Sequence, residues 1–253
     1  MRLVRAEFRK LFSTKLWLWM LITSLGLTAL FVSLTIAFDG QDDGPGAFGL
    51  VTAEGQRNLF ATAGFAGVLS LVLGTIGITG EFRHQTITPT FLTSPHRGRV
   101  VLAKLLTYAI VGLGLAAAGL ALTLAISLPW VSAKDIDLSL TANGIPGTML
   151  GVVVGTTVYG LVGVGIGALV RNQIAAVVGS LVFLFILEPV VSAIPKVRDY
   201  YKYFPGGANA ALTDSTQNQV SLLDPWQGGA LLVAYGLALA MLGSYLSVRR
   251  DVT

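Results

Sequence analysis

Few residues of this sequence belong to types that carry out chemistry, and their spacing favours none of the common sites. The histidines, His84 and His96, are separated by proline and have no acid in coordinating register, so a metal pair is a weak interpretation. The chain has no cysteine, which excludes disulfides and thiolate metal sites. It also lacks the G-x-x-x-x-G-K-[ST] pattern that cradles ATP phosphates. We therefore expect no catalytic residue, no metal and no cofactor on this chain.

The polar residues Ser180 and Glu188 are of interest because they lie inside a long apolar run. An intramembrane serine protease would use such a serine, but it also needs a histidine at membrane depth, and both histidines lie in a polar segment. A charge at the centre of a membrane costs roughly 2.5–3.5 kcal/mol, so acids there tend to be paired, protonated or functional. Glu188 therefore has two interpretations. It forms a hydrogen bond to the backbone of the following loop, especially around residues 200–204, or it lines a substrate path or pairs with a cationic substrate.

The overall composition is that of a membrane protein. Of the 253 residues, 53% are apolar and 12% are charged, and the mean hydropathy is +0.72. So little polar surface cannot cover a soluble globule. The net charge of +4 does not indicate nucleic-acid binding, because the basic residues flank apolar runs and do not cluster on a water-facing surface.

The apolar runs predict an all-α polytopic protein with a single transmembrane domain over residues 1–253. The first uncharged run, Leu16 to Phe38, reaches roughly 34 Å as a helix, which is enough to cross the hydrocarbon. Six such spans are expected, at about residues 16–38, 59–80, 105–131, 145–170, 174–194 and 226–248. In the fourth span, glycines at four-residue spacing form one stripe that favours close helix packing: Gly147, Gly151, Gly155, Gly163 and Gly167.

Two amphipathic segments accompany the spans. Residues 2–13 place apolar side chains on one helical face and basic residues on the rest, a pattern typical of an interfacial helix. The second segment is the polar stretch 81–104, where residues 84–91 form two helical turns with Ile87, Phe91 and Leu92 on one face. Pro95 then ends this short helix. Glu81 is expected at its positive end, paired with Arg83 or Arg99.

The distribution of charge predicts the orientation. If the termini, the 81–104 segment and the Arg171 turn share one side, that side holds twelve lysines and arginines and the other holds five. This is the positive-inside bias. Both termini are therefore expected in the cytoplasm, with the chain in the cytoplasmic membrane.

Three stretches resemble the permease subunits of type-2 ATP-binding-cassette (ABC) transporters, of the small six-span bacterial exporter kind. AEFRKLFSTKLW (residues 6–17) is similar to the family's acid, aromatic, basic, Leu, x, Ser/Thr, x, basic pattern before the first span. EFRHQTITPTFLTSPHRGRVVLAK (81–104) resembles the segment that holds the family's coupling helix, and YFPGGANAAL (203–212) resembles its Tyr-Leu-Pro segment. The chain departs from the family at Gln85, where glycine is usual, at Phe204, where leucine is usual, and at Pro89, which shortens the coupling helix.

The resemblance implies a division of labour between subunits. Two permease chains, identical or related, would pair in the membrane, and separate ATPase subunits would bind ATP and Mg²⁺ and push on the permease from below. The residues implied in ATPase coupling are Glu81, Arg83, His84, Thr86, Ile87, Phe91, Leu92, Pro95 and Arg97. Those implied for the interfacial helix are Glu7, Phe8, Lys10 and Leu11, and Glu188 is the candidate on the substrate path.

The expected function is ATP-driven export of an amphiphile such as a lipid, peptide antibiotic or drug, with no nucleic-acid partner. One alternative is a non-transporting sensor or immunity partner of an ATPase, which the sequence does not separate from an exporter. A secondary transporter is the other. Such a protein needs ion or proton relay groups and usually a repeat between halves, and the sequence offers one shallow glutamate and no visible repeat.

Overall fold

The computed structural model describes residues 2–40, 49–83, 97–213 and 221–249. Throughout these ranges the regular secondary structure is helical, which confirms the all-α prediction. The helices are α1 (Arg2–Ser13), α2 (Leu16–Ala37), α3 (Ala53–Ala61), η1 (Thr62–Phe65), α4 (Ala66–Arg83), α6 (Arg97–Ser132), α7 (Ile145–Val170), α8 (Gln173–Val182), η2 (Phe183–Leu187), α9 (Glu188–Ala193), η3 (Arg198–Tyr203), α10 (Pro205–Leu212) and α11 (Pro225–Arg249). The short coupling helix expected at residues 84–92 falls outside the described ranges.

The six predicted spans are confirmed as helices. Within the described ranges, six stretches are long and apolar enough to cross a membrane: Leu16–Ala37, Ala53–Arg83, Gly98–Ser132, Ile145–Val170, Gln173–Ala193 and Pro225–Gly243. The second begins earlier than predicted because Thr52 caps it, with its side chain accepting the N–H of Gly55 at 3.0 Å. The first turns of this span contain polar side chains, and these form hydrogen bonds within the protein. The buried side chain of Gln56 donates to the carbonyls of Leu50 and Asp137 at 3.1 and 2.8 Å.

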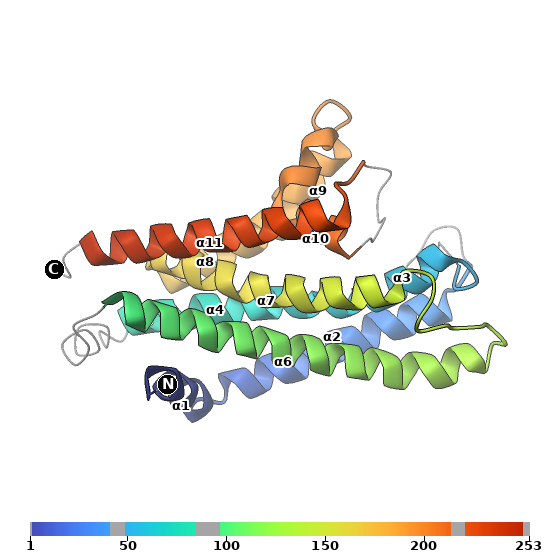
Figure 1. The fold of residues 1–253 in the computed structure, drawn as a ribbon, viewed down its shortest axis with the longest axis horizontal. Coiled ribbons are helices and arrows are strands. Elements are labelled where there is room, and N and C mark those ends of the chain that lie inside the picture. The colour runs from blue at the N-terminus through green and yellow to red at the C-terminus, as the bar shows by residue number, and fades with distance from the viewer. Residues whose placement is uncertain (1, 41–48, 84–96, 214–220, 250–253) are drawn as a thin grey trace.

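The helix α7 lies at the centre of the bundle and packs against α4, α6 and α11 (Figure 1). The glycines of α7 allow neighbouring helices to approach closely. The single glycine stripe contacts two different helices, α10 and α4. A Cβ built on Gly151 would overlap backbone of α10, and one built on Gly163 would overlap the carbonyl oxygen of Leu71 on α4. Gly147, in contrast, has no atom within 4 Å of a built Cβ, so it takes no part in the packing.

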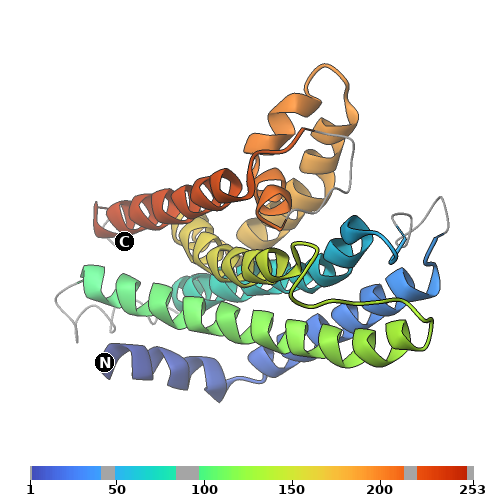
Figure 2. The ribbon, with the colours of Figure 1, turned by 45° about the vertical axis from the view of Figure 1, so that its right-hand side comes forward.

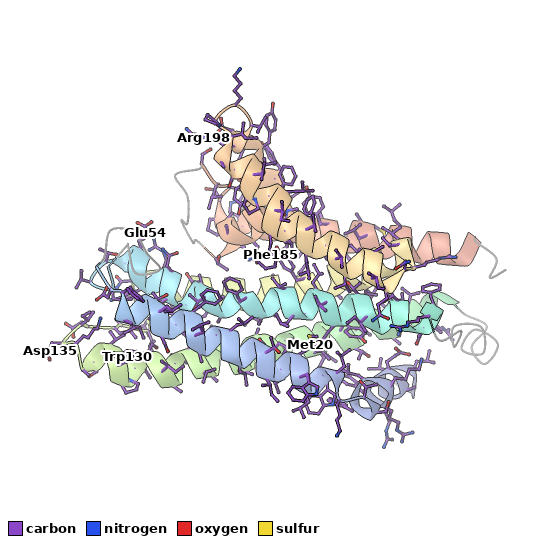
Figure 3. All side chains as sticks on the ribbon, turned by 180° about the vertical axis from the view of Figure 1, so that it is seen from behind. Met20, Glu54, Trp130, Asp135, Phe185 and Arg198 are labelled. Atoms are coloured by element: carbon purple, nitrogen blue, oxygen red, sulfur yellow. The ribbon has the colours of Figure 1, made fainter. Side chains whose placement is uncertain are left out.

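The helix α1 lies across one end of the bundle. Figure 1 looks nearly along its axis while it shows the spans from the side, and Figure 2 shows α1 turning into α2. The chain's first and last helices and the facing ends of α4 and α6 all reach this end. Glu54, Asp135 and Trp130 lie at the opposite end, as Figure 3 shows from behind. This arrangement fits an interfacial helix that runs along a membrane surface.

The fifth span bends away from the other helices (Figures 1 and 2). It consists of α8, the π-helical turn η2 and α9, and the bend comes immediately before Pro189. Proline has no N–H and its ring crowds the carbonyl four residues earlier, so a wide turn at this point relieves the clash. The chain then turns back through η3 and α10, and α10 packs against α11.

Candidate coupling site

Four charged side chains meet where α1 crosses the ends of α4 and α6. Lys10 Nζ lies 2.7 Å from Glu7 Oε1 and 2.7 Å from Glu81 Oε1. Lys104 Nζ lies 3.1 Å from Glu81 Oε1 and also pairs with Glu7 Oε2. We call this group the ion cluster, and its members are Glu7, Lys10, Glu81 and Lys104.

Three helices bring the ion cluster together. Glu7 and Lys10 are three residues apart on α1 and therefore share one face of that helix. Glu81 lies in the last turns of α4, and Lys104 lies in the second turn of α6. Leu11 fixes α1 in place, because it is 7% exposed and packs in a core with residues of α4, α6 and α7.

The charges of the ion cluster balance, and all of its members except Lys10 are buried. Lys104 is 2% exposed, while Glu7 and Glu81 are 6% and 8% exposed. Two carboxylates face two ammonium groups, and Lys104 also donates to the carbonyl of Gly77 at 3.1 Å. Buried charges are tolerated when each has opposite charges and hydrogen bonds around it, and removing one of them leaves the others uncompensated.

The partners set the protonation of the two groups on α1. Burial favours the neutral form of Glu7, but Lys104 and Lys10 outweigh it and lower the pKa of Glu7. Burial likewise opposes the charge on Lys10, yet Glu7 and Glu81 raise the pKa of Lys10. The stability that Glu7 contributes is therefore lost as pH falls through its lowered pKa, and that of Lys10 is lost as pH rises through its raised pKa.

Only some of the predicted coupling residues meet in the ion cluster. Glu7, Lys10 and Glu81 meet in the ion cluster, and Phe8 on the same helix is half-buried. The expected partners of Glu81 were wrong: its ion pairs are with Lys10 and Lys104, while Arg83 is exposed at the end of α4. The position of Glu81 also differs, since it lies inside α4. Arg97 is the first residue of α6, and its side chain is outside the part of the chain that the structure describes. The remaining predicted residues lie outside the described ranges: His84, Thr86, Ile87, Phe91, Leu92 and Pro95.

Two residues at this end of the bundle were not predicted as site residues. Lys104 is a member of the ion cluster, but it was not among the residues of the 81–104 segment that were expected at the site. Arg171, in the turn between α7 and α8, places its guanidinium 5.1 Å from the centre of the Phe82 ring on α4. A signal for Lys104 is present in the sequence, because a lysine facing the interior of a membrane bundle needs an acid, and Glu81 is the nearest one.

Glu188 forms a separate polar contact near the other end of the bundle. It is 2% exposed, and its Oε1 accepts the N–H of Gly206 at 3.0 Å. Gly206 is in the first turn of α10, where backbone N–H groups lack partners within the helix. A Cβ on Gly206 would overlap the Glu188 carboxylate, so glycine allows this approach. The acceptor role expected for Glu188 thus has a partner two residues beyond the segment 200–204.

Substitutions of Glu188 distinguish its two interpretations. Glu188→Gln keeps an oxygen for the Gly206 N–H and is expected to leave the melting temperature nearly unchanged. Glu188→Ala leaves that N–H buried without an acceptor and is expected to cost about 1–3 kcal/mol of stability. Thermal unfolding in detergent measures both. A Glu188→Gln variant that melts like wild type but transports a cationic substrate poorly would instead indicate a role of the charge on the substrate path.

A protein-family model matches nearly the whole chain. The model of the family described as "ABC-2 family transporter protein" matches residues 1–246. The chain belongs to the ABC-2 transporter family. A comparison with curated proteins gave no match.

Membership of the ABC-2 family confirms the resemblance drawn from residues 6–17, 81–104 and 203–212. The match covers α1, the six spans and the residues of the ion cluster. This ABC-2 protein is therefore a multi-pass membrane component of an ABC transporter, a permease.

Proposed function

We propose that this ABC-2 protein is the permease subunit of an ABC exporter that moves an amphiphilic molecule, such as a lipid, peptide antibiotic or drug, across the cytoplasmic membrane. Separate ATPase subunits bind ATP and Mg²⁺ and supply the energy. A second permease chain, identical or related, completes the membrane part. The termini and the ion cluster face the cytoplasm, in keeping with the excess of lysine and arginine on that side.

The ion cluster is the observation that best supports the proposal. Residues 84–96 leave α4 three residues after Glu81 and rejoin the chain at α6, seven residues before Lys104. A force on this segment therefore reaches both sides of the ion cluster. Through Glu7 and Lys10 it also reaches α1, which continues into the first span. A subunit that binds at this end can thus move three spans together.

The proposal predicts that the apolar face of residues 84–92 binds the ATPase subunits. The double substitution Ile87→Asp and Phe91→Asp puts two charges on that face, and desolvating them opposes binding. We expect ATP-dependent transport to fall by at least about tenfold, equivalent to ~1.4 kcal/mol of lost interaction. The measurement is substrate efflux and ATP hydrolysis by the reconstituted complex, with co-purification of the ATPase.

A matched control places a charge at the opposite end. Val51 is 79% exposed beside the start of α3, so Val51→Asp adds a charge where no ATPase is expected. This variant should transport and co-purify as wild type does. The coupling assignment would be wrong if the Ile87 and Phe91 substitutions left both binding and transport unchanged. Retained ATPase binding without any ATP-dependent transport by the wild-type complex would favour a sensor or immunity partner.

A further inference from the structure

An apolar cavity of about 330 Å³ lies where the fifth span departs from the bundle. Its wall is formed by α4, α7, α8, η2 and α11, together with Pro205 of α10. The volume lies within the range of about 300–1,000 Å³ that is usual for small-molecule sites. Residues from five helices and the π turn line it, among them Leu71, Val162, Ser180, Phe183, Leu232 and Leu239.

The cavity offers an occupant almost no polar contact. The Ser180 hydroxyl donates to the carbonyl of Ala176 at 2.7 Å, and the Tyr235 hydroxyl donates to the carbonyl of Tyr203 at 2.6 Å. These two hydroxyl protons are therefore engaged within the protein, and the third hydroxyl among the lining residues is that of Tyr159. A water molecule needs two to four polar partners, roughly, to be stable in a buried site. The wall thus favours a hydrocarbon over water.

The length of the cavity matches one leaflet of a membrane. Along α7 its lining runs from Tyr159 to Val170. At about 1.5 Å per residue this distance is ~16 Å, which is about half of the ~30 Å hydrocarbon core. Arg171 follows Val170 directly, and its guanidinium lies over the Phe82 ring of α4, so this end of the cavity is at the basic end of the bundle.

The cavity is also open to the surrounding membrane. Val170 is 44% exposed, and the lining residues Ala175 and Gly179 of α8 are exposed as well. The cavity is therefore continuous with the bilayer-facing surface of the bundle. A chain from the adjacent leaflet can enter from the side without crossing a polar barrier.

We propose that this cavity binds one acyl chain of a membrane amphiphile, taken from the leaflet at the Arg171 end of the bundle. The binding goes beyond the proposed transport function, because it needs neither the ATPase nor a second permease chain. The amphiphile is either a resident phospholipid or the exported cargo, and both present the same hydrocarbon chain to the wall.

A photoreactive phospholipid tests the proposal. The full chain is reconstituted into phosphatidylcholine vesicles that contain a phosphatidylcholine with a diazirine in one acyl chain, and the labelled residues are mapped by mass spectrometry. We expect the lining residues of α7, α8 and α11 to be labelled about tenfold more than lipid-facing residues of α6. Equal labelling of both groups would overturn the proposal.

Matched leucine substitutions locate the bound chain. A Cβ built on Gly179 meets no atom within 4 Å, so Gly179→Leu places a side chain in the cavity without moving backbone. Gly114 on α6 is equally unobstructed and exposed but lies outside the cavity, which makes Gly114→Leu the control. We expect labelling of the lining to fall about tenfold in Gly179→Leu and to stay unchanged in Gly114→Leu. Ala175→Phe is a second filling variant, and unchanged labelling in both filled variants would overturn the proposal.

A second arm separates the two sources of the chain. The labelling is repeated in the complete transporter with the ATPase subunits, with and without ATP. A resident phospholipid gives the same labelling in both conditions, whereas an exported cargo is displaced and its labelling falls during ATP hydrolysis. Either result supports an acyl-chain site. Because the first arm contains no ATPase, its failure overturns the site and leaves the proposed transport function to its own test.

Discussion

Replacing Lys104 with methionine is expected to lower the free energy of unfolding by about 3–5 kcal/mol, the usual cost of removing one partner from a buried ion group. Methionine keeps most of the side-chain volume but not the charge. Glu7 and Glu81 would then remain buried with only Lys10 between them, and Lys10 is partly exposed, at 45% of its side chain. A loss of this size lowers the melting temperature of a chain of this length by roughly 10 °C. Thermal unfolding in detergent or nanodiscs measures it.

Lys15 provides the matched control for Lys104. It lies in the short link between α1 and α2 and is exposed, so Lys15→Met is expected to change the stability by less than about 0.5 kcal/mol. Adding Glu7→Gln to Lys104→Met removes one of the two carboxylates and restores an equal number of opposite charges. The double variant is therefore expected to melt above Lys104→Met. If Lys104→Met melted like Lys15→Met, the ion cluster would not hold α1 to the spans.

The spans were predictable because the bilayer imposes a simple rule on them. Each hydrocarbon crossing needs about 20 apolar residues, and a run that meets this length is visible in the sequence. The fourth span, predicted at residues 145–170, has these bounds in the structure. The helix at residues 2–13 was equally visible, because its apolar side chains recur at helical spacing.

The ion cluster was less predictable because its contacts join distant parts of the chain. Lys10 meets Glu81 across 71 residues, and Lys104 meets Glu7 across 97. The sequence offered Arg83 and Arg99 as nearer partners of Glu81. Only the crossing of α1 over the ends of α4 and α6 brings Lys10 within reach, and that crossing is a tertiary property. The resemblance to the family therefore pointed to Glu7, Lys10 and Glu81 but not to how they pair.

The fifth span shows a similar limit. The sequence marks an unusual point at Glu188 and Pro189, but it does not show that the preceding turn widens into η2. It also does not show that residues 205–212 form a helix whose first turn meets Glu188. The partner of a buried acid depends on which helix terminus folds back to it, and short helices have weak local signals.

The substitution of Gly163 by alanine is expected to have the second large effect on stability. A Cβ at this position would overlap the carbonyl oxygen of Leu71, which is backbone and cannot rotate away. The central helix α7 and its neighbour α4 would have to separate, at a cost of about 1–3 kcal/mol or more. Small residues allow such close contacts between membrane helices, where van der Waals packing is a main source of association. The melting temperature in detergent measures the loss.

Gly147 on the same helix separates this packing effect from the general effect of alanine in a helix. No atom lies within 4 Å of a Cβ built there, so Gly147→Ala has no steric cost and gains up to about 1 kcal/mol in helix propensity. We expect Gly147→Ala to melt at or slightly above the wild-type temperature and Gly163→Ala well below it. Equal melting temperatures would mean that the contact between α4 and α7 tolerates a methyl group. The glycine stripe would then reflect a property other than packing at that position, and the close approach of the two helices would not be required for stability.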